Sequence, residues 1–255
     1  MSEQNNIFLL RGIKLSFKPY AEIDELLKQQ PNGKYEHISI GYANQYTITL
    51  TSNSENLKEI FTKFSFIFPD GIGVHTAVRF LKLNGVGYGC IQNATDLNYK
   101  ILEFTHYHSK KMFVLGSTQM SMEKFIENIR KSFPGIQIVG YHDGYNDINS
   151  LDLIEQINNS KADILIVGMG QPKQELWYNH HREQISIPVT VMVGGFIDFF
   201  SGYKKRAPKI FRLAGLEWLF RLLQEPQRLW KRYLLGIPKF IIIILKQRLI
   251  IWLKK

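Results

Sequence analysis

An aspartate followed by two glycines stands at the end of an apolar segment, in residues 68–73 (FPDGIG). In α/β proteins, ligands bind beyond the carboxyl ends of the strands, so Asp70 occupies a position suited to catalysis or to ligand contact. The two glycines would let a ligand come close to backbone N–H groups at the start of a following helix. Alternatively, Asp70 only caps that helix or the turn before it.

Two other segments place polar side chains directly after strand-like sequence. Residues 168–175 (GMGQPKQE) combine glycines with Gln and Lys at the start of a predicted helix, which suits a diphosphate or a sugar. A generic strand–helix loop would carry similar residues. Residues 193–198 (VGGFID) place Asp198 just past a strand, where it could accept hydrogen bonds from a nucleobase or a ribose, or cap a helix.

The histidines and the cysteine form no pattern typical of a metal or nucleophile site. The seven histidines include no HExxH spacing, and the chain has no GxSxG segment. The single Cys90 excludes an intramolecular disulfide and a CxxC metal site, fits a reducing compartment and is interpreted as a core residue. Residues 85–89 (GVGYG) follow helix-like sequence and are interpreted as a turn. We therefore expect neither a metal nor a cofactor.

Positive charge is concentrated at the C-terminal end. Residues 203–255 hold 14 Lys and Arg against two acids, a net charge of +12, whereas the rest of the chain holds 18 basic and 20 acidic groups. This asymmetry points to a polyanionic partner, which could be a phosphate ligand, a nucleic acid or an anionic membrane face. Guanidinium groups match phosphate oxygens, although a solvated cationic surface is the alternative. The candidates for phosphate contact are Arg206, Arg212, Arg221, Arg228, Lys231 and Arg232.

The elements that must position these side chains are clearest in the middle of the chain, where short Val- and Ile-rich segments alternate with helix-like segments. Short apolar strands separated by helices indicate a parallel sheet with helices on both faces, a Rossmann-like α/β fold. Ser117 is expected to cap the first of these helices. The strands are predicted at residues 111–116, 136–141, 163–170 and 187–195, and the helices at 118–131, 151–159 and 172–183.

The N-terminal part is less regular. Strands are expected within 37–44 and 64–68, and helices at 21–29, 74–83 and 96–107. Residues 45–51 (QYTITLT) are ambiguous, because their β-branched content favours a strand but tertiary context can override that preference.

After Gly202 the sequence changes to Arg-rich helices, predicted at about 208–224, 226–235 and 238–253. We therefore divide the chain into an α/β body, 1–202, and a basic helical C-terminal appendage, 203–255. On the last helix, apolar residues recur every three or four positions beside lysines and arginines, as in a helix that lies on a membrane surface. The alternative is that they dock on the protein's own core. They are Ile241, Ile242, Leu245, Leu249, Trp252 and Leu253.

Nothing in the sequence is typical of a spanning or exported segment. The longest apolar run, residues 240–245, is far shorter than the roughly 20 residues of a spanning helix. The first residues lack the basic region of a signal peptide. With 45% apolar and 13% aromatic residues, the composition excludes a disordered chain. We expect a cytoplasmic protein without a transmembrane anchor.

Four segments together resemble the bacterial WecG/TagA/CpsF family of glycosyltransferases: 68–81 (FPDGIGVHTAVRFL), 138–145 (IVGYHDGY), 167–177 (VGMGQPKQELW) and 193–233. The resemblance implies transfer of a sugar, typically of the N-acetylmannosamine type, from a UDP-sugar to an undecaprenyl-diphosphate-linked saccharide in surface polysaccharide synthesis. It implies an inverting, metal-independent reaction at the inner face of the cell membrane, to which the protein would attach peripherally through anionic lipid.

The resemblance also implies roles for individual residues. Asp70 falls on the family's Asp-Gly motif and would be the general base that removes the proton of the acceptor hydroxyl, a contribution worth about 10²–10⁴ in rate. Asn44, after the second core strand, would lie on the substrate side. Gln174 and Asp198 match positions near the nucleotide.

Two arginines of the appendage complete the site that the resemblance implies. Arg221 and Arg228 would neutralise the leaving diphosphate. The chain departs from the family pattern at Tyr42, where many members have Thr, at residues 94–97 (ATDL), where many have Gly-x-Asp-Leu, and at Lys231, where Arg is frequent. These departures concern the identity of donor and acceptor more than the class of reaction.

Three other functions remain to be weighed. A family member could use a glucose- or uronic-acid-type donor instead. A nucleic-acid-binding protein could use the basic appendage, but the sequence shows neither aromatic–basic interleaving nor a recognition helix, so we expect no nucleic-acid partner. A catalytically inert membrane adaptor is disfavoured because Asp70 and Gln174 are retained.

Overall fold

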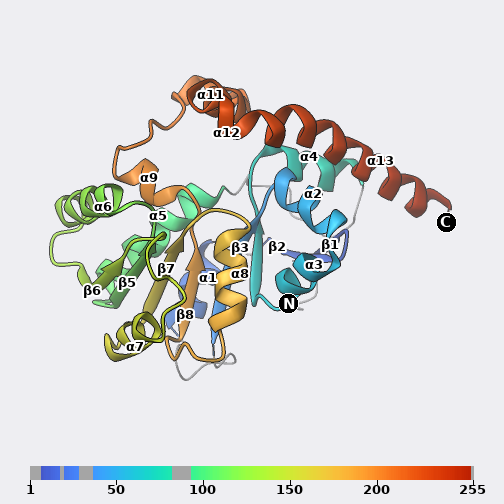
Figure 1. Ribbon diagram of the computed structural model, residues 1–255. Helices are drawn as coiled ribbons and strands as arrows, with labels where there is room; N and C mark the ends of the chain where they lie inside the picture. Colours follow the sequence, from blue (N-terminus) through green and yellow to red (C-terminus); the bar gives the residue numbers. More distant parts are fainter. Residues whose placement is uncertain (1–6, 18–19, 29–36, 82–92, 254–255) are drawn as a thin grey trace.

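The computed structural model describes residues 7–17, 20–28, 37–81 and 93–253 of the 255-residue chain. Its centre is a six-stranded sheet in which every neighbouring pair of strands is parallel, in the order β4-β3-β8-β7-β5-β6 (Figure 1). The predicted turn at 85–89 and Cys90 lie outside the described residues. The strands are β3 (Ile38–Ala43), β4 (Phe66–Pro69), β5 (Lys111–Gly116), β6 (Gln137–His142), β7 (Ile164–Gly168) and β8 (Val189–Met192).

Successive side chains of the central strands alternate between two apolar cores, one on each face of the sheet. In β5, Phe113 and Leu115 belong to one core, whereas Met112 and Val114 belong to the other. A parallel strand covered on both faces has to be apolar throughout, which explains the unbroken Val- and Ile-rich segments of the sequence. The predicted Rossmann-like α/β fold is confirmed.

Helices cover both of these cores. Within residues 1–202, those that contribute to the core of Phe113 are α2 (Gln45–Asn53), α3 (Glu55–Thr62), α4 (Ile72–Phe80), α7 (Leu151–Asn159) and α8 (Lys173–His181). Those that contribute to the core of Met112 are α1 (Tyr20–Lys28), α5 (Ala94–Tyr107), α6 (Gln119–Ser132) and α9 (Phe196–Phe200).

Two N-terminal features differ from the sequence-based expectation. Residues 45–51, with their β-branched content, form helix α2, because Asn44 caps it by accepting hydrogen bonds from the backbone of Tyr46 and Thr47. An antiparallel hairpin, β1 (Ile7–Leu10) and β2 (Ile13–Ser16), was not predicted. Its two-residue turn, Arg11-Gly12, has positive φ at both positions, the geometry of a tight hairpin turn.

The N-cap of α6 is Thr118, so the prediction of Ser117 is wrong by one residue. Ser117 has a φ of 58°, and its hydroxyl is hydrogen-bonded to Asp198. This side chain is therefore used to connect β5 to the segment after β8 rather than to cap the helix.

The C-terminal region is helical, as predicted, but more divided. The single helix expected at 208–224 is broken at Gly215, which has a φ of 71°. Residues 231–235 form a π-helical turn rather than a continuation of an α-helix. The elements are α10 (Lys209–Leu213), α11 (Glu217–Gln224), α12 (Pro226–Trp230), η2 (Lys231–Leu235) and α13 (Gly236–Leu253).

Helix α13 runs beside α2 and α4 and continues past them (Figure 1). Phe240 and Ile244 are buried and join the same core as Phe113, which attaches the helix to the body. The predicted stripe faces the other way: Ile241, Ile242 and Leu245 are about half exposed, and Trp252 is 68% exposed. The alternative in which this stripe docks on the protein's own core is therefore wrong.

In the part of the chain that the structure describes, no helix is both long enough and apolar enough to cross a bilayer.

Candidate active site

A cavity of about 640 Å³ opens at the carboxyl ends of the strands, where the loops after β3, β4, β5, β7 and β8 converge. Its other walls come from the start of α5, the segment after β6, and α11, α12 and η2, so the C-terminal appendage helps to close a site that the sheet begins. All six residues to which the family resemblance assigns roles line this cavity: Asn44, Asp70, Gln174, Asp198, Arg221 and Arg228. Of the other candidates for phosphate contact, Arg232 lines it, whereas Arg206, Arg212 and Lys231 do not.

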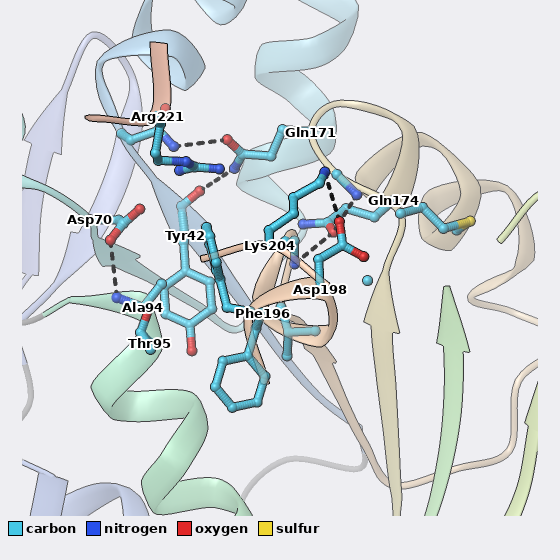
Figure 2. A pocket seen from close by; sticks show the side chains of 18 of the residues that line it. Tyr42, Asp70, Ala94, Thr95, Gln171, Gln174, Phe196, Asp198, Lys204 and Arg221 are labelled. Atoms are coloured by element: carbon cyan, nitrogen blue, oxygen red, sulfur yellow. Dashed lines mark hydrogen bonds and ion pairs between the residues drawn. The ribbon is translucent and has the colours of Figure 1, made fainter. Parts of the chain in front are cut away.

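Asp70 follows β4 and is held in place from two sides. Its backbone N–H donates to the carbonyl of Ala43, 2.8 Å away, and its carboxylate Oδ1 accepts from the backbone N–H of Ala94 at 3.0 Å (Figure 2). Its side chain does not cap α4, the helix that follows it. At the N-cap position, Gly71 has a φ of 77° and open space where a Cβ would stand. Oδ2 has no hydrogen bond to any described residue and is available to a ligand.

The side chain of Asn44 makes its hydrogen bonds within the protein. Its Oδ1 caps α2, and its Nδ2 donates to Gln171 Oε1 at 3.2 Å. Gln171 in turn donates from Nε2 to the carbonyl of Tyr42 at 2.7 Å, as Figure 2 shows. Sequence analysis did not single out Gln171, although it lies within the GMGQPKQE segment; it connects the ends of β3 and β7.

The side chain of Gln174, like that of Asn44, makes its hydrogen bonds within the protein. The residue is 1% exposed, and its Oε1 accepts from the backbone N–H groups of Gly170, at 3.2 Å, and Gly194, at 3.0 Å. Its Nε2 donates to Glu175 Oε1 at 2.8 Å. The amide therefore fixes the loops after β7 and β8 relative to each other, and it leaves one N–H for a ligand.

Glu175 lies directly behind this amide and was not expected at the site. It is fully buried, and Oε2 has no hydrogen-bond partner. Burial raises the pKa of Glu175 to about 7, against the opposing effect of hydrogen bonds from Gln174 and Gln171 and the charge of Arg232. Near neutral pH this carboxyl group is therefore divided between its acid and its carboxylate form.

Asp198 belongs to a chain of charged groups that joins the sheet to the appendage. Its carboxylate accepts from the hydroxyls of Ser117 and Ser121, and it pairs with Lys204 at 2.8 Å (Figure 2). Burial acts to raise the pKa of Asp198, but Lys204 and the two hydroxyls outweigh it and lower the pKa. Lys204 also lies 3.3 Å from Glu225, the residue between α11 and α12.

Two arginines of the appendage reach the cavity without an acidic partner among the described residues. Arg221, on α11, places its Cζ 5.1 Å from the ring of Phe199. Arg232, on η2, places its Cζ 4.5 Å from the ring of Tyr46, and its Nε is buried without a hydrogen-bond partner. Burial lowers the pKa of Arg232, as does the charge of Arg221, whereas Asp70 acts to raise it.

Arg232 is the functional residue that sequence reasoning left among the general phosphate candidates. Its neighbour Lys231 carries the same charge, so charge alone does not distinguish the two. Arg232 lines the cavity, as Arg228 does four residues earlier, while Lys231 is exposed and lies against Trp230. Residues four apart share a face of a helix, so the spacing from Arg228 is the signal that could have found Arg232.

A tyrosine and an asparagine form part of the cavity wall beside Asp70. Tyr42 is buried, lies against Phe68 and donates from its hydroxyl to Asn98 Oδ1 at 2.5 Å. Asn98, on α5, is 2% exposed, and its Nδ2 has no hydrogen-bond partner. The Nδ2 group of Asn98 is therefore a hydrogen-bond donor at the cavity wall that is available to a ligand.

Within the described ranges, no group of three or more His, Cys, Asp or Glu side chains could hold a metal ion. The side chains that bring positive charge to the cavity are lysines and arginines: Lys173, Lys204, Arg221, Arg228 and Arg232.

The chain is similar over most of its length to known proteins. A family model described as "Glycosyl transferase WecG/TagA/CpsF family" matches residues 12–252. A protein of Bacillus spizizenii is 32% identical over 240 residues, which cover 90% of this chain and 91% of that protein. A protein of Staphylococcus aureus strain MW2 is 33% identical over 233 residues, 84% of this chain and 86% of that one. Both are named "N-acetylglucosaminyldiphosphoundecaprenol N-acetyl-beta-D-mannosaminyltransferase".

Proposed function

Because the chain belongs to the WecG/TagA/CpsF family of glycosyltransferases, we propose that it transfers a sugar from a UDP-sugar to a saccharide carried on undecaprenyl diphosphate. The donor sugar is of the N-acetylmannosamine type, as the names of the relatives indicate. One observation supports this most strongly: the carboxylate of Asp70 and the guanidinium groups of Arg221 and Arg232 line one cavity. A base and a diphosphate-binding group are the two parts that such a transfer needs.

Asp70 is the general base of the reaction. One carboxylate oxygen is held by Ala94, and the other takes the proton from the attacking hydroxyl of the acceptor. That hydroxyl oxygen forms a bond to the anomeric carbon of the donor sugar on the face opposite the diphosphate. The bond from this carbon to the diphosphate oxygen breaks with its electron pair, so the configuration inverts and UDP leaves. Base catalysis of this kind contributes about 10²–10⁴ to the rate.

The arginines stabilise the charge that develops on the departing diphosphate. Guanidinium groups can bind two phosphate oxygens at once, and inside a partly closed cavity such bonds are stronger than in water. Positive charge near this point lowers the barrier to bond cleavage without a proton transfer to the leaving group.

Helix α13 attaches the protein to the inner face of the cell membrane, where the lipid-linked acceptor lies. Its exposed side carries Ile241, Leu245 and Leu249, together with the exposed Lys239 and Lys246. An apolar stripe beside cations is the pattern of a helix that lies in the interface of an anionic membrane. Each cation near such a surface contributes about 1 kcal/mol before screening by salt.

A screen of donors tests the proposed reaction. Full-length protein is incubated with a short-chain lipid-diphosphate N-acetylglucosamine acceptor and, in separate reactions, UDP-activated N-acetylmannosamine, N-acetylglucosamine, glucose and glucuronic acid. We expect the acceptor to gain the mass of an N-acetylhexosamine only with the N-acetylmannosamine donor. A product only with glucose or glucuronic acid would replace the proposed donor, and absence of product with every donor would contradict the proposed transfer.

A further inference from the structure

The side-chain amide of Asn98 has one end that is hydrogen-bonded and one that is not. Asn98 is 2% exposed, and its Oδ1 accepts a hydrogen bond from the hydroxyl of Tyr42 at 2.5 Å. Its Nδ2 has no hydrogen-bond partner among the described residues, although the residue lines the cavity. A buried donor without a partner costs free energy, and a ligand atom that accepts a hydrogen bond from it would offset that cost.

Asn98 lies one helical turn from the backbone group that holds Asp70. The N–H of Ala94, in the first turn of α5, donates to the Asp70 carboxylate at 3.0 Å, and Asn98 follows Ala94 by four residues. Residues four apart are neighbours on the surface of a helix. A group bound by Asn98 is therefore close to the proposed base, where the donor and acceptor sugars of the proposed reaction meet.

The surroundings of this donor are apolar. Tyr42, Val193 and Phe196 are each 5% exposed, belong to the core on the side of the sheet that α5 covers, and line the cavity. In Figure 2 the rings of Tyr42 and Phe196 lie between the side chains of Asp70 and Asp198. An N–H donor next to aromatic rings fits a group that combines a carbonyl oxygen with a methyl group. A carbonyl oxygen only accepts hydrogen bonds, whereas a sugar hydroxyl would also bring a donor into these apolar surroundings.

We propose that Asn98 binds the acetamido group of an N-acetylated sugar: Nδ2 donates to the acetamido carbonyl oxygen, and the methyl group packs on the rings of Tyr42 and Phe196. Tyr42 is a positioning residue, because its hydroxyl holds Oδ1 of Asn98. The inference rests on the proposed function for the reaction and adds the side chain that selects N-acetylated hexoses over hexoses without an acetyl group. The donor of the proposed reaction and the N-acetylglucosamine acceptor used to test it both carry an acetamido group, so the experiment has to distinguish these two sources.

Four variants of the full-length protein separate the contacts. Asn98→Leu removes the donor and keeps the approximate size of the side chain. Tyr42→Phe leaves Asn98 in place but removes the hydroxyl that orients it. The double variant Tyr42→Phe/Asn98→Leu removes both partners together, which destabilises less than removing one of them and keeps the test available if Asn98→Leu alone does not fold. Tyr99→Phe, at a residue of α5 that is 42% exposed and does not line the cavity, is the control.

The readout is the preference for an acetylated ligand, expressed as a ratio of dissociation constants measured by titration calorimetry. The donor pair is UDP-N-acetylmannosamine and UDP-mannose, and the acceptor pair is a short-chain lipid diphosphate that bears N-acetylglucosamine or glucose. We expect the unchanged protein to prefer the acetylated member of one pair, and Asn98→Leu to reduce that preference about tenfold to a hundredfold. The reduction should be smaller in Tyr42→Phe, equal to that of Asn98→Leu in the double variant, and absent in Tyr99→Phe.

The two ratios identify the source of the acetamido group and exclude a structural role. A fall in the ratio of the donor pair assigns the group to the nucleotide sugar, and a fall in the ratio of the acceptor pair assigns it to the lipid-linked sugar. A structural disturbance would weaken the binding of both members of a pair equally and leave their ratio unchanged. If neither ratio differs between the unchanged protein and the variants that lack Asn98, the proposal is wrong.

The same measurement separates this proposal from the proposed function, because binding requires no turnover. A protein that transfers no sugar but loses its preference in Asn98→Leu would contradict the proposed reaction and support the role of Asn98. A protein that transfers N-acetylmannosamine but binds acetylated and non-acetylated ligands equally well would support the reaction and contradict the role of Asn98.

Discussion

The buried carboxyl group of Glu175 makes the stability of this protein depend on pH in a way that one substitution should remove. The pKa of Glu175 is about 7 in the folded protein, and its ordinary value is 4.5. Since one pKa unit corresponds to about 1.4 kcal/mol, the difference amounts to about 3 kcal/mol. The group is fully buried, so solvent does not screen this effect.

The direction of the pH effect on stability follows from which state, folded or unfolded, holds the proton of Glu175 more tightly. Below about pH 4.5 the carboxyl group is protonated in both the folded and the unfolded chain, and its contribution to the free energy of unfolding is complete. As the pH rises, the unfolded chain loses this proton first, so the contribution falls until the folded protein also ionises near pH 7. Of the full effect, about 2.5 kcal/mol is lost between about pH 5 and about pH 8.

Glu175→Gln keeps the size of the side chain and an acceptor for Gln174, but it cannot ionise. Urea unfolding of the variant and of the unchanged protein is measured at several pH values, and the difference between their free energies of unfolding is plotted. We expect this difference to shift in favour of the variant by about 2.5 kcal/mol from about pH 5 to about pH 8. Other titrating groups, His181 included, are common to both proteins and cancel.

Glu183→Gln is the matched control, because Glu183 follows the same helix and its side chain is 86% exposed. Its difference curve should be flat. A flat curve for Glu175→Gln as well would refute the reasoning, since it would mean that burial does not perturb this carboxyl group.

Three shorter predictions follow from the rest of the structure. Lys204→Met should lower the free energy of unfolding by about 1 kcal/mol in urea titrations, because it removes the cation that Asp198 and Glu225 share, although Glu225 keeps Arg228. Replacing Leu245 and Leu249 by Ser should abolish co-sedimentation with anionic vesicles without changing the thermal midpoint, since both are about half exposed; unchanged co-sedimentation would contradict attachment through α13. Treatment with EDTA should leave transferase activity intact, and a loss restored by Mg²⁺ or Mn²⁺ would contradict that.

Most of the sheet could be predicted from the sequence because its central strands are apolar on both faces. The segments that became β5 and β7 stand out for this reason, whereas the edge strand β6 is exposed or half-buried along its length. Helix α7 was predicted with its observed bounds, Leu151–Asn159. Residues 45–51 were not resolved by the same argument, because their β-branched content competes with a cap from Asn44 that only the folded chain displays. The hairpin of β1 and β2 is short and carries weak periodicity.

The candidate site was predictable where a side chain follows a strand, directly for Asp70 after β4 and within the short helix α9 for Asp198 after β8. It was less predictable where position depends on packing of the appendage. Lys231 and Arg232 carry the same charge, and only Arg232 lines the cavity, on the same helix face as Arg228. The buried state of Glu175 likewise depends on contacts from distant segments.

The most direct test of the account is the turnover number of Asp70→Asn with both substrates at saturation. The amide oxygen of Asn can still accept the hydrogen bond from Ala94, so the substitution removes the base and leaves the local structure in place. Asp152→Asn, at an exposed aspartate in the first turn of α7, is the control. We expect Asp70→Asn to lose about 10²–10⁴ in turnover while UDP binding is unchanged. Turnover close to that of the control would contradict the assignment of Asp70 as the base.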